Sequence, residues 1–213
     1  MREIELDGNS LSLEHAMSIA EGSAIAKLSE KSRKRMVDSR AAVENLIESG
    51  ETVYGINTGF GAMSSIRIGD DELEQLQENL VRSHACGVGE RMEPEHVLLM
   101  MIFRANSLAK GVSGSRPELV EMILSMVNSR IAPCVPRIGS LGASGDLAPL
   151  SHMALSLMGE GECLVEQNGD WVSSDSMTAL SAAGIETIKL QAKEGLSLIN
   201  GTSQMCAYLT ASL

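Results

Sequence analysis

The sequence is poor in aromatic residues, since two Phe, two Tyr and one Trp make up only 2% of its 213 residues. A β-sandwich fills its core with aromatic and β-branched side chains, so this scarcity argues against that architecture. Thirteen methionines are present instead, and flexible Met side chains fill the gaps between packed helices. We therefore predict a mainly α protein with a few short strands.

Cysteine is scarce and widely spaced. Cys86, Cys134, Cys163 and Cys206 form no C-x-x-C pair. This spacing argues against a zinc site or a disulfide framework and is typical of free thiols in a reducing compartment. No metal-ligand spacing is present elsewhere in the chain, so no metal site is expected.

Positive charge and long apolar runs are lacking too. The formal net charge is −11, and no basic stripe is available to neutralise phosphates, which argues against a nucleic-acid partner. The longest apolar run, residues 97–103, is too short to span a bilayer. Residues 1–8 are charged and lack an apolar signal region. We expect a cytoplasmic protein without a membrane partner.

Most of the sequence shows helical spacing of apolar residues, with residues typical of helix starts and ends. Helices are predicted to be capped by Ser32, Asp70 and Asp146 and to open at Pro94 and Pro117. A strong hairpin turn signal lies at 168–169 (Asn-Gly), and a short helix is expected over 175–183. A helical segment from residue 193 is interrupted at 200–201 and continues to the last residue. We divide the chain into domains at 1–192 and 193–213.

Two glycine-rich loops, 55–61 and 139–145, indicate unusual backbone dihedrals. The second contains Ala143, Ser144 and Gly145, which by themselves are typical of a tight connection. If the loop is tightly folded, the Gly145 amide nitrogen can attack the Ala143 carbonyl carbon. Loss of that oxygen as water, followed by loss of the Ser144 hydroxyl as a second water, leaves 4-methylidene-imidazol-5-one.

Each residue meets a demand of this route. Ala143 is small at the attacked carbon, Ser144 carries a β-hydroxyl that can leave, and Gly145 has no side chain to block the approach of its nitrogen. The product is an electrophile that the twenty side chains lack. A helix N-terminus directly after it would stabilise negative charge that develops on the ring.

Five segments together resemble the ammonia-lyase and aminomutase family that makes this prosthetic group, and in particular the N-terminal half of its histidine ammonia-lyase branch. They occur in the family's order and extend over nearly the whole chain. The segments are 54–61 (YGINTGFG), 79–89 (NLVRSHACGVG), 104–111 (RANSLAKG), 139–154 (GSLGASGDLAPLSHMA) and 193–202 (KEGLSLINGT).

The resemblance implies a role for Tyr54 as the catalytic base that removes the β-proton of the substrate. By itself, Tyr54 at a glycine-rich loop is typical of an ordinary half-buried tyrosine. An unperturbed tyrosine has a pKa of about 10. The site must therefore favour phenolate or couple the proton transfer tightly.

Three more residues have both a structural and a functional interpretation. From spacing, His84 is a core histidine, Asn200 a helix break and Asp146 an N-cap. The resemblance implies that His84 contacts the substrate imidazole, since Ser83 and His84 match histidine lyases. It also implies that the Asn200 amide lies against the prosthetic group and that Asp146 assists ring formation. His152 is assigned only a packing role.

The predicted reaction converts L-histidine to urocanate and ammonia, and it needs no metal or nucleotide. One alternative is a tyrosine or phenylalanine ammonia-lyase or an aminomutase on the same scaffold. Another is a non-catalytic half-protein, because family members are longer and assemble their active sites from several subunits. The chain is therefore expected to form a homo-oligomer, to bind a separate C-terminal half chain, or both.

Overall fold

The computed structural model describes residues 1–61, 64–69, 72–142 and 145–213. About 49% of the chain is helical with few short strands, which confirms the predicted mainly α class. The helices are α1 (Leu13–Ala20), α2 (Glu30–Glu48), α3 (Leu73–His84), α4 (Pro94–Leu108), α5 (Pro117–Asn128), α6 (Leu147–Leu157), α7 (Ser176–Ala182), α8 (Glu194–Ile199) and α9 (Ser203–Ala211). The strands are β1 (Arg2–Leu6), β2 (Ala24–Leu28), β3 (Val88–Arg91), β4 (Ile131–Pro133), β5 (Pro136–Ile138), β6 (Glu162–Gln167) and β7 (Asp170–Asp175).

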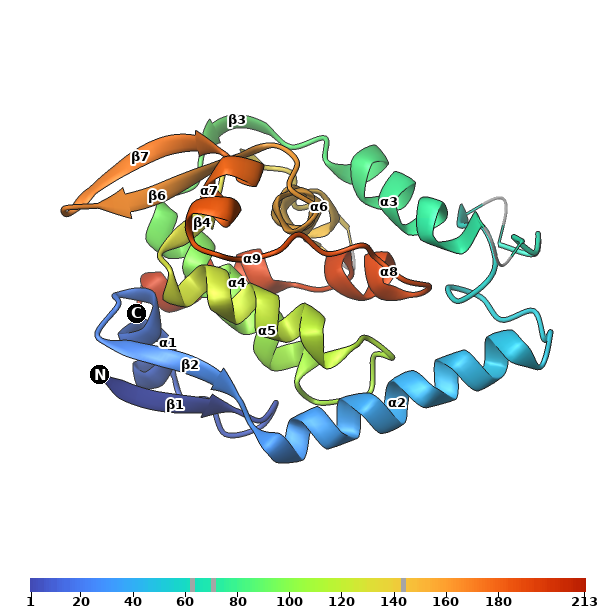
Figure 1. Ribbon diagram of the computed structural model, residues 1–213. Coiled ribbons are helices and arrows are strands. Elements are labelled where there is room, and N and C mark those ends of the chain that lie inside the picture. Colours follow the sequence, from blue (N-terminus) through green and yellow to red (C-terminus); the bar gives the residue numbers. More distant parts are fainter. Residues whose placement is uncertain (62–63, 70–71, 143–144) are drawn as a thin grey trace.

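Helix α4 lies at the centre of the molecule, with α1, α5 and α9 packed against it (Figure 1). It opens at Pro94, as predicted, because proline suits the first helical position, where no N–H partner is needed. Residues 97–102 are each at most 1% exposed. A helix buried all round in this way organises the core, and methionines fill much of it: Met36, Met92, Met100, Met101, Met122, Met126 and Met153.

The N-terminal region contains a parallel pair of strands that the sequence patterns did not identify. Strands β1 and β2 pair from Arg2 opposite Ala24 to Leu6 opposite Leu28, and α1 connects them. The predicted cap of the following helix is wrong, because Ser29 rather than Ser32 accepts the hydrogen bond at the N-terminus of α2. Strand β2 ends at Leu28, so the helix begins directly after Ser29.

The remaining strands form small antiparallel sheets over the other side of α4. Strands β6 and β7 form the predicted hairpin, and its two turn residues, Asn168 and Gly169, have φ values of 54° and 91°. Two positive φ angles suit the right-handed twist of the strands they join. Asp175 caps α7 through a hydrogen bond from the Thr178 backbone N–H, which agrees with the short helix predicted there.

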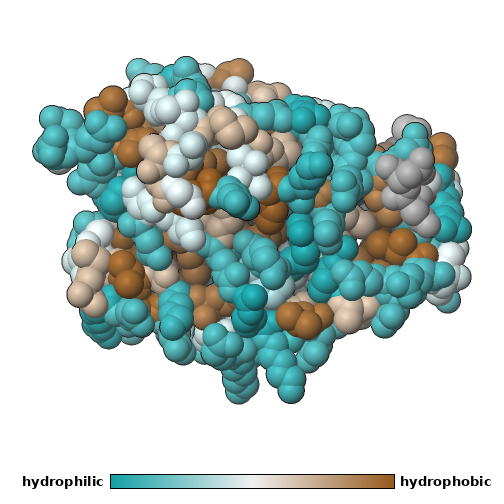
Figure 2. All heavy atoms as spheres, in the orientation of Figure 1, coloured by the Kyte–Doolittle hydropathy of each residue, from teal (hydrophilic) through white to brown (hydrophobic). Residues whose placement is uncertain are grey.

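The last segment also agrees with its prediction, because α8 and α9 are separate helices with residues 200–202 between them. Leu198, Ile199 and Ala207 of this segment belong to the same buried cluster as α4. The domain boundary between residues 192 and 193 stays a prediction. Hydrophilic residues cover most of the face shown in Figure 2. In the described ranges, no helix is long and apolar enough to cross a membrane.

Candidate active site

The loop before α6 is tightly folded at its described ends. The Leu141 N–H donates to the Gly145 carbonyl at 2.8 Å, and the Gly145 N–H donates to the Gly142 carbonyl at 3.2 Å. Gly145 has a φ of 68°, which glycine adopts without steric cost. Ala143 and Ser144 lie outside the described residues. The two ends of the loop are therefore held together around the predicted ring-forming triplet.

Asp146 occupies the N-cap position of α6, but its side chain does not cap that helix. Its Oδ2 accepts hydrogen bonds from the backbone N–H groups of Gln204 at 2.7 Å and Met205 at 3.1 Å, in the first turn of α9. The side chain is fully buried, and its Oδ1 has no partner among the described residues. The prediction that Asp146 caps its own helix, α6, is thus wrong. Its carboxylate instead caps α9, which begins 57 residues later in the chain.

Asn200 follows α8 and lies next to the loop through its neighbour Gly201. The Asp146 N–H donates to the Gly201 carbonyl at 3.1 Å, and Gly145 and Gly201 form a short parallel bridge. On the other side, Arg104 Nη1 donates to the Asn200 carbonyl at 2.9 Å. The structure therefore brings Asn200 next to Gly145 and Asp146, although more than 50 residues separate it from them in the sequence.

Helix α8 is held at its N-terminus by two other helices. Gln77 of α3 accepts a hydrogen bond at its Oε1 from the Gly195 N–H at 3.0 Å. Glu194 is fully buried and binds Arg116 at the start of α5, with Oε2 to Nη2 at 2.7 Å and Oε1 to Nε at 2.9 Å. This hydrogen-bonded ion pair raises the pKa of Arg116. Such contacts fix the position of the helix that directly precedes Asn200.

Tyr54 lies on a loop that touches α8. Its side chain is 60% exposed and packs edge-to-face on Phe60, with 6.3 Å between ring centroids. A Cβ atom at Gly55 would lie 2.8 Å from Leu196 Cδ2, so the backbone beside Tyr54 is in close contact with α8. The structural alternative of a half-buried tyrosine is wrong, since Tyr54 is an exposed residue.

His84 ends α3 and is half-buried. Its Nδ1 lies 2.8 Å from the Leu80 carbonyl oxygen. A carbonyl can only accept, so this contact requires a proton on Nδ1, and in the neutral ring Nε2 is then the acceptor. His152 of α6 fixes the chain that follows, because its Nε2 accepts a hydrogen bond from the Gly87 N–H at 3.1 Å. Burial lowers the pKa of His152.

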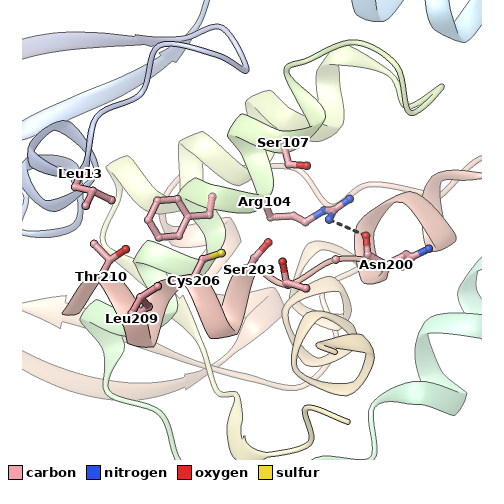
Figure 3. A pocket seen from close by; sticks show the side chains of 11 residues that line it. Leu13, Arg104, Ser107, Asn200, Ser203, Cys206, Leu209 and Thr210 are labelled. Carbon is pink, nitrogen blue, oxygen red and sulfur yellow. Dashed lines mark hydrogen bonds between the residues drawn. The ribbon is translucent and has the colours of Figure 1, made fainter. Parts of the chain in front are cut away.

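The described hydrogen bonds do not join Tyr54, His84 and the Asn200 amide to one another. Around the junction of α4 and α9 lies a pocket of about 480 Å³ that the sequence did not predict. Figure 3 shows the Arg104 guanidinium directed at Asn200 at one end of this pocket and apolar side chains at the other. It is lined by Leu13, Phe103, Arg104, Ser107, Asn200, Gly201, Thr202, Ser203, Cys206, Leu209 and Thr210. In the described ranges, no cluster of side chains suited to a metal ion is found.

The chain matches a known enzyme family over nearly its whole length. The family model described as aromatic amino acid lyase matches residues 11–213, and the chain belongs to that family. Among curated relatives, the histidine ammonia-lyase of Shouchella clausii (strain KSM-K16) is 51% identical over 202 residues, which is 95% of this chain and 40% of the relative. The chain thus spans about 40% of the length of such relatives.

Solved structures show the same relationship. The histidine ammonia-lyase from Trypanosoma cruzi superimposes with a TM-score of 0.89 at 38% identity, over 100% of this chain and 40% of that one. The tyrosine aminomutase from Streptomyces globisporus gives a TM-score of 0.87 at 36% identity, over 98% of this chain and 38% of that one. Similarity extends to enzymes with different named substrates, so the fold does not select the substrate.

Proposed function

We propose that this chain is the part of an L-histidine ammonia-lyase that forms the electrophilic prosthetic group and supplies the base. The product would be urocanate, with release of ammonia. The observation that carries this proposal is the hydrogen bond from the Asp146 N–H to the Gly201 carbonyl. It holds the end of the ring-forming loop beside Asn200, the residue expected to contact the group.

The described residues around the loop suit a 4-methylidene-imidazol-5-one group formed from Ala143, Ser144 and Gly145. The Gly145 nitrogen, which must attack the Ala143 carbonyl, is turned back toward Gly142 by a hydrogen bond. A buried carboxylate oxygen, Asp146 Oδ1, has no described partner and is available as a proton acceptor. When formed, the group supplies an electrophile that makes the substrate's ammonia a better leaving group.

Three side chains have distinct tasks in this proposal. Tyr54, at 60% exposure, is accessible to take the β-proton from a substrate. Asn200, held at its carbonyl by Arg104, presents its amide to the prosthetic group and the substrate. Asp146 holds the first turn of α9 and stands directly after the ring-forming residues.

His84 supports histidine as the substrate. In the neutral ring with its proton on Nδ1, its Nε2 is an acceptor with no described hydrogen-bond partner, so it can accept the N–H of a substrate imidazole. Phenylalanine would leave that acceptor unpaired, which discriminates against it more strongly than a difference in apolar fit. A tyrosine hydroxyl can also donate, and the likeness to a tyrosine aminomutase makes tyrosine turnover the principal rival.

The greater length of the relatives favours a second candidate function for this chain. The chain spans 40% of them, and the pocket beside Asn200 is bordered by exposed apolar residues, including Leu13 and Leu209. In this alternative, the chain is a non-catalytic half that needs a C-terminal chain or a homo-oligomer to complete its active site. A cytoplasmic setting is proposed with it.

The first experiment compares the intact mass of the purified chain with the mass calculated from its sequence, with Ser144→Ala as the control. A deficit of two water molecules that is absent in Ser144→Ala is the expected result. An unmodified mass would overturn ring formation by the chain alone. Urocanate production from histidine would then be assayed with and without the added C-terminal region of a relative, since activity only on mixing identifies a half-protein.

The substrate is tested separately with histidine, tyrosine and phenylalanine. We expect histidine to be the preferred substrate and His84→Leu to abolish that preference. Histidine turnover that survives unchanged in His84→Leu would contradict the substrate assignment. It would leave ring formation, which the mass measures independently, unaffected.

A further inference from the structure

Arg104 is a buried cation with no carboxylate partner among the described residues. It is 5% exposed, and none of the described carboxylates forms an ion pair with it. Burial lowers the pKa of Arg104 to about 10, which still leaves it protonated at neutral pH. A buried charge is costly unless other groups compensate it, so its hydrogen-bond partners reveal what it holds.

Those partners are two carbonyls at the C-terminal end of α8. Nη1 donates to the Asn200 carbonyl at 2.9 Å, and Nη2 donates to the Ser197 carbonyl. Carbonyls in the last turn of a helix have no partner within the helix and carry partial negative charge. The guanidinium therefore closes the end of α8 at the point where the chain turns toward α9.

Gly201 confirms how closely the guanidinium approaches this turn. A Cβ atom at Gly201 would clash with Arg104 Nη1, so any side chain there would displace the guanidinium. The carbonyl of the same glycine accepts the Asp146 N–H at 3.1 Å. Arg104 thus contacts this turn through Asn200 (Figure 3), while Gly145 and Asp146 contact it through Gly201.

We propose that Arg104 is a positioning residue that fixes Asn200 and Gly201 against Gly145 and Asp146. It acts through the backbone and does not touch the substrate. Its functional consequence rests on the proposed function, because correct placement of this turn would then control ring formation at Ser144. Its structural consequence, a rigid junction between the loop and the two helices, does not depend on that function.

The test compares Arg104→Met and Arg104→Lys with a matched control, Arg130→Met. Arg130 also donates to a backbone carbonyl, that of Ala20, and it pairs with Glu166. Neither partner belongs to the junction. The control thus removes a comparable arginine–carbonyl contact elsewhere in the chain.

The first readout is amide hydrogen exchange in the full chain. We expect exchange at Asp146, Gln204 and Met205 to be at least about tenfold faster in Arg104→Met, because local opening of the junction becomes easier. Arg130→Met should leave these three rates unchanged. Equal rates in both variants would overturn the proposal. If Arg104→Met does not fold, the same comparison is made with Arg104→Lys, which keeps the charge but cannot span both carbonyls.

The second readout is the fraction of chain that lacks two water molecules. It should fall in Arg104→Met, recover in part in Arg104→Lys, and stay at the level of the unsubstituted chain in Arg130→Met. Equal ring formation in Arg104→Met and Arg130→Met would refute control of the ring by Arg104. Absence of the ring from the unsubstituted chain would instead count against the proposed function, and the exchange rates would still decide the role of Arg104.

Discussion

The carboxylate of Asp146 and the backbone N–H of Gln204 lie 2.7 Å apart, so a residue at the start of α6 caps the start of α9. The same carboxylate oxygen accepts the Met205 N–H. Helix α6 therefore begins directly after Asp146, α9 begins at the buried side chain of the same residue, and the ring-forming loop ends beside both. This arrangement makes the stability of α9 depend on the loop that the proposed chemistry would modify.

Replacement of that carboxylate should destabilise the protein. We expect Asp146→Ala to lower the free energy of unfolding by about 1–2 kcal/mol, since two N–H groups in the first turn of α9 lose their acceptor. Urea denaturation measures this. Asp175→Ala, which removes an exposed cap at α7, serves as the control and should cost less. An Asp146→Ala variant as stable as the unsubstituted chain would contradict the capping role.

The buried ion pair at the start of α8 should be more sensitive than pairs at the surface. We expect Glu194→Ala to lower the free energy of unfolding by about 3 kcal/mol, because it leaves the Arg116 guanidinium without its partner. Glu121→Ala, which breaks an exposed pair with Arg33, should cost about 0–1 kcal/mol. Similar losses in urea denaturation of both variants would show that burial of Glu194 adds nothing.

Substitution of two glycines in the Tyr54 loop tests the contact between this loop and α8. Gly55 and Gly61 both have positive φ, but a Cβ atom would meet Leu196 only at Gly55. We expect Gly55→Ala to cost about 1–2 kcal/mol more than Gly61→Ala in thermal or urea unfolding, owing to overpacking.

A second substitution checks the cause of that difference. Leu196→Ala in the Gly55→Ala background removes the atom that the new methyl group would meet. The cost of Gly55→Ala should then approach that of Gly61→Ala. If the difference between the two glycines persists in the Leu196→Ala background, steric contact with α8 is not its origin.

His152 predicts a dependence of stability on pH. Burial lowers its pKa in the folded state, and its Nε2 must stay unprotonated to accept the Gly87 N–H. The unfolded chain therefore binds the proton more readily, and stability should fall as the pH drops below about 6.5, the ordinary value, toward the lowered one. Urea denaturation from pH 8 to 5 should show a smaller loss in His152→Gln; identical profiles would exclude His152 as the cause.

Much of the helical framework could be predicted because its signals are local. Pro94 and Pro117 open their helices at the expected positions, and Asp175 caps α7. Asn168 and Gly169 turn the β6–β7 hairpin. In each case a residue's own backbone preference decides the outcome, so a window of a few residues is sufficient.

Other features could not be predicted because they depend on distant partners. The parallel pairing of β1 with β2 joins residues about 22 positions apart, and no local pattern selects that register. Ser29 and Ser32 are both capable caps, and the end of β2 decided between them. The sequence shows Arg104 only as one residue of a family motif. Its burial and its hydrogen bonds to the α8 carbonyls depend on tertiary packing, so they could not be predicted.

The sequence by itself determined the mainly α class, the family resemblance and the candidate residues Tyr54, His84 and Asn200, because motifs and helical periodicity are properties of neighbouring residues. Only the tertiary structure decided that Asp146 caps α9 rather than its own helix. A buried carboxylate binds whichever N–H groups the packing brings within reach, and packing is set by the whole chain.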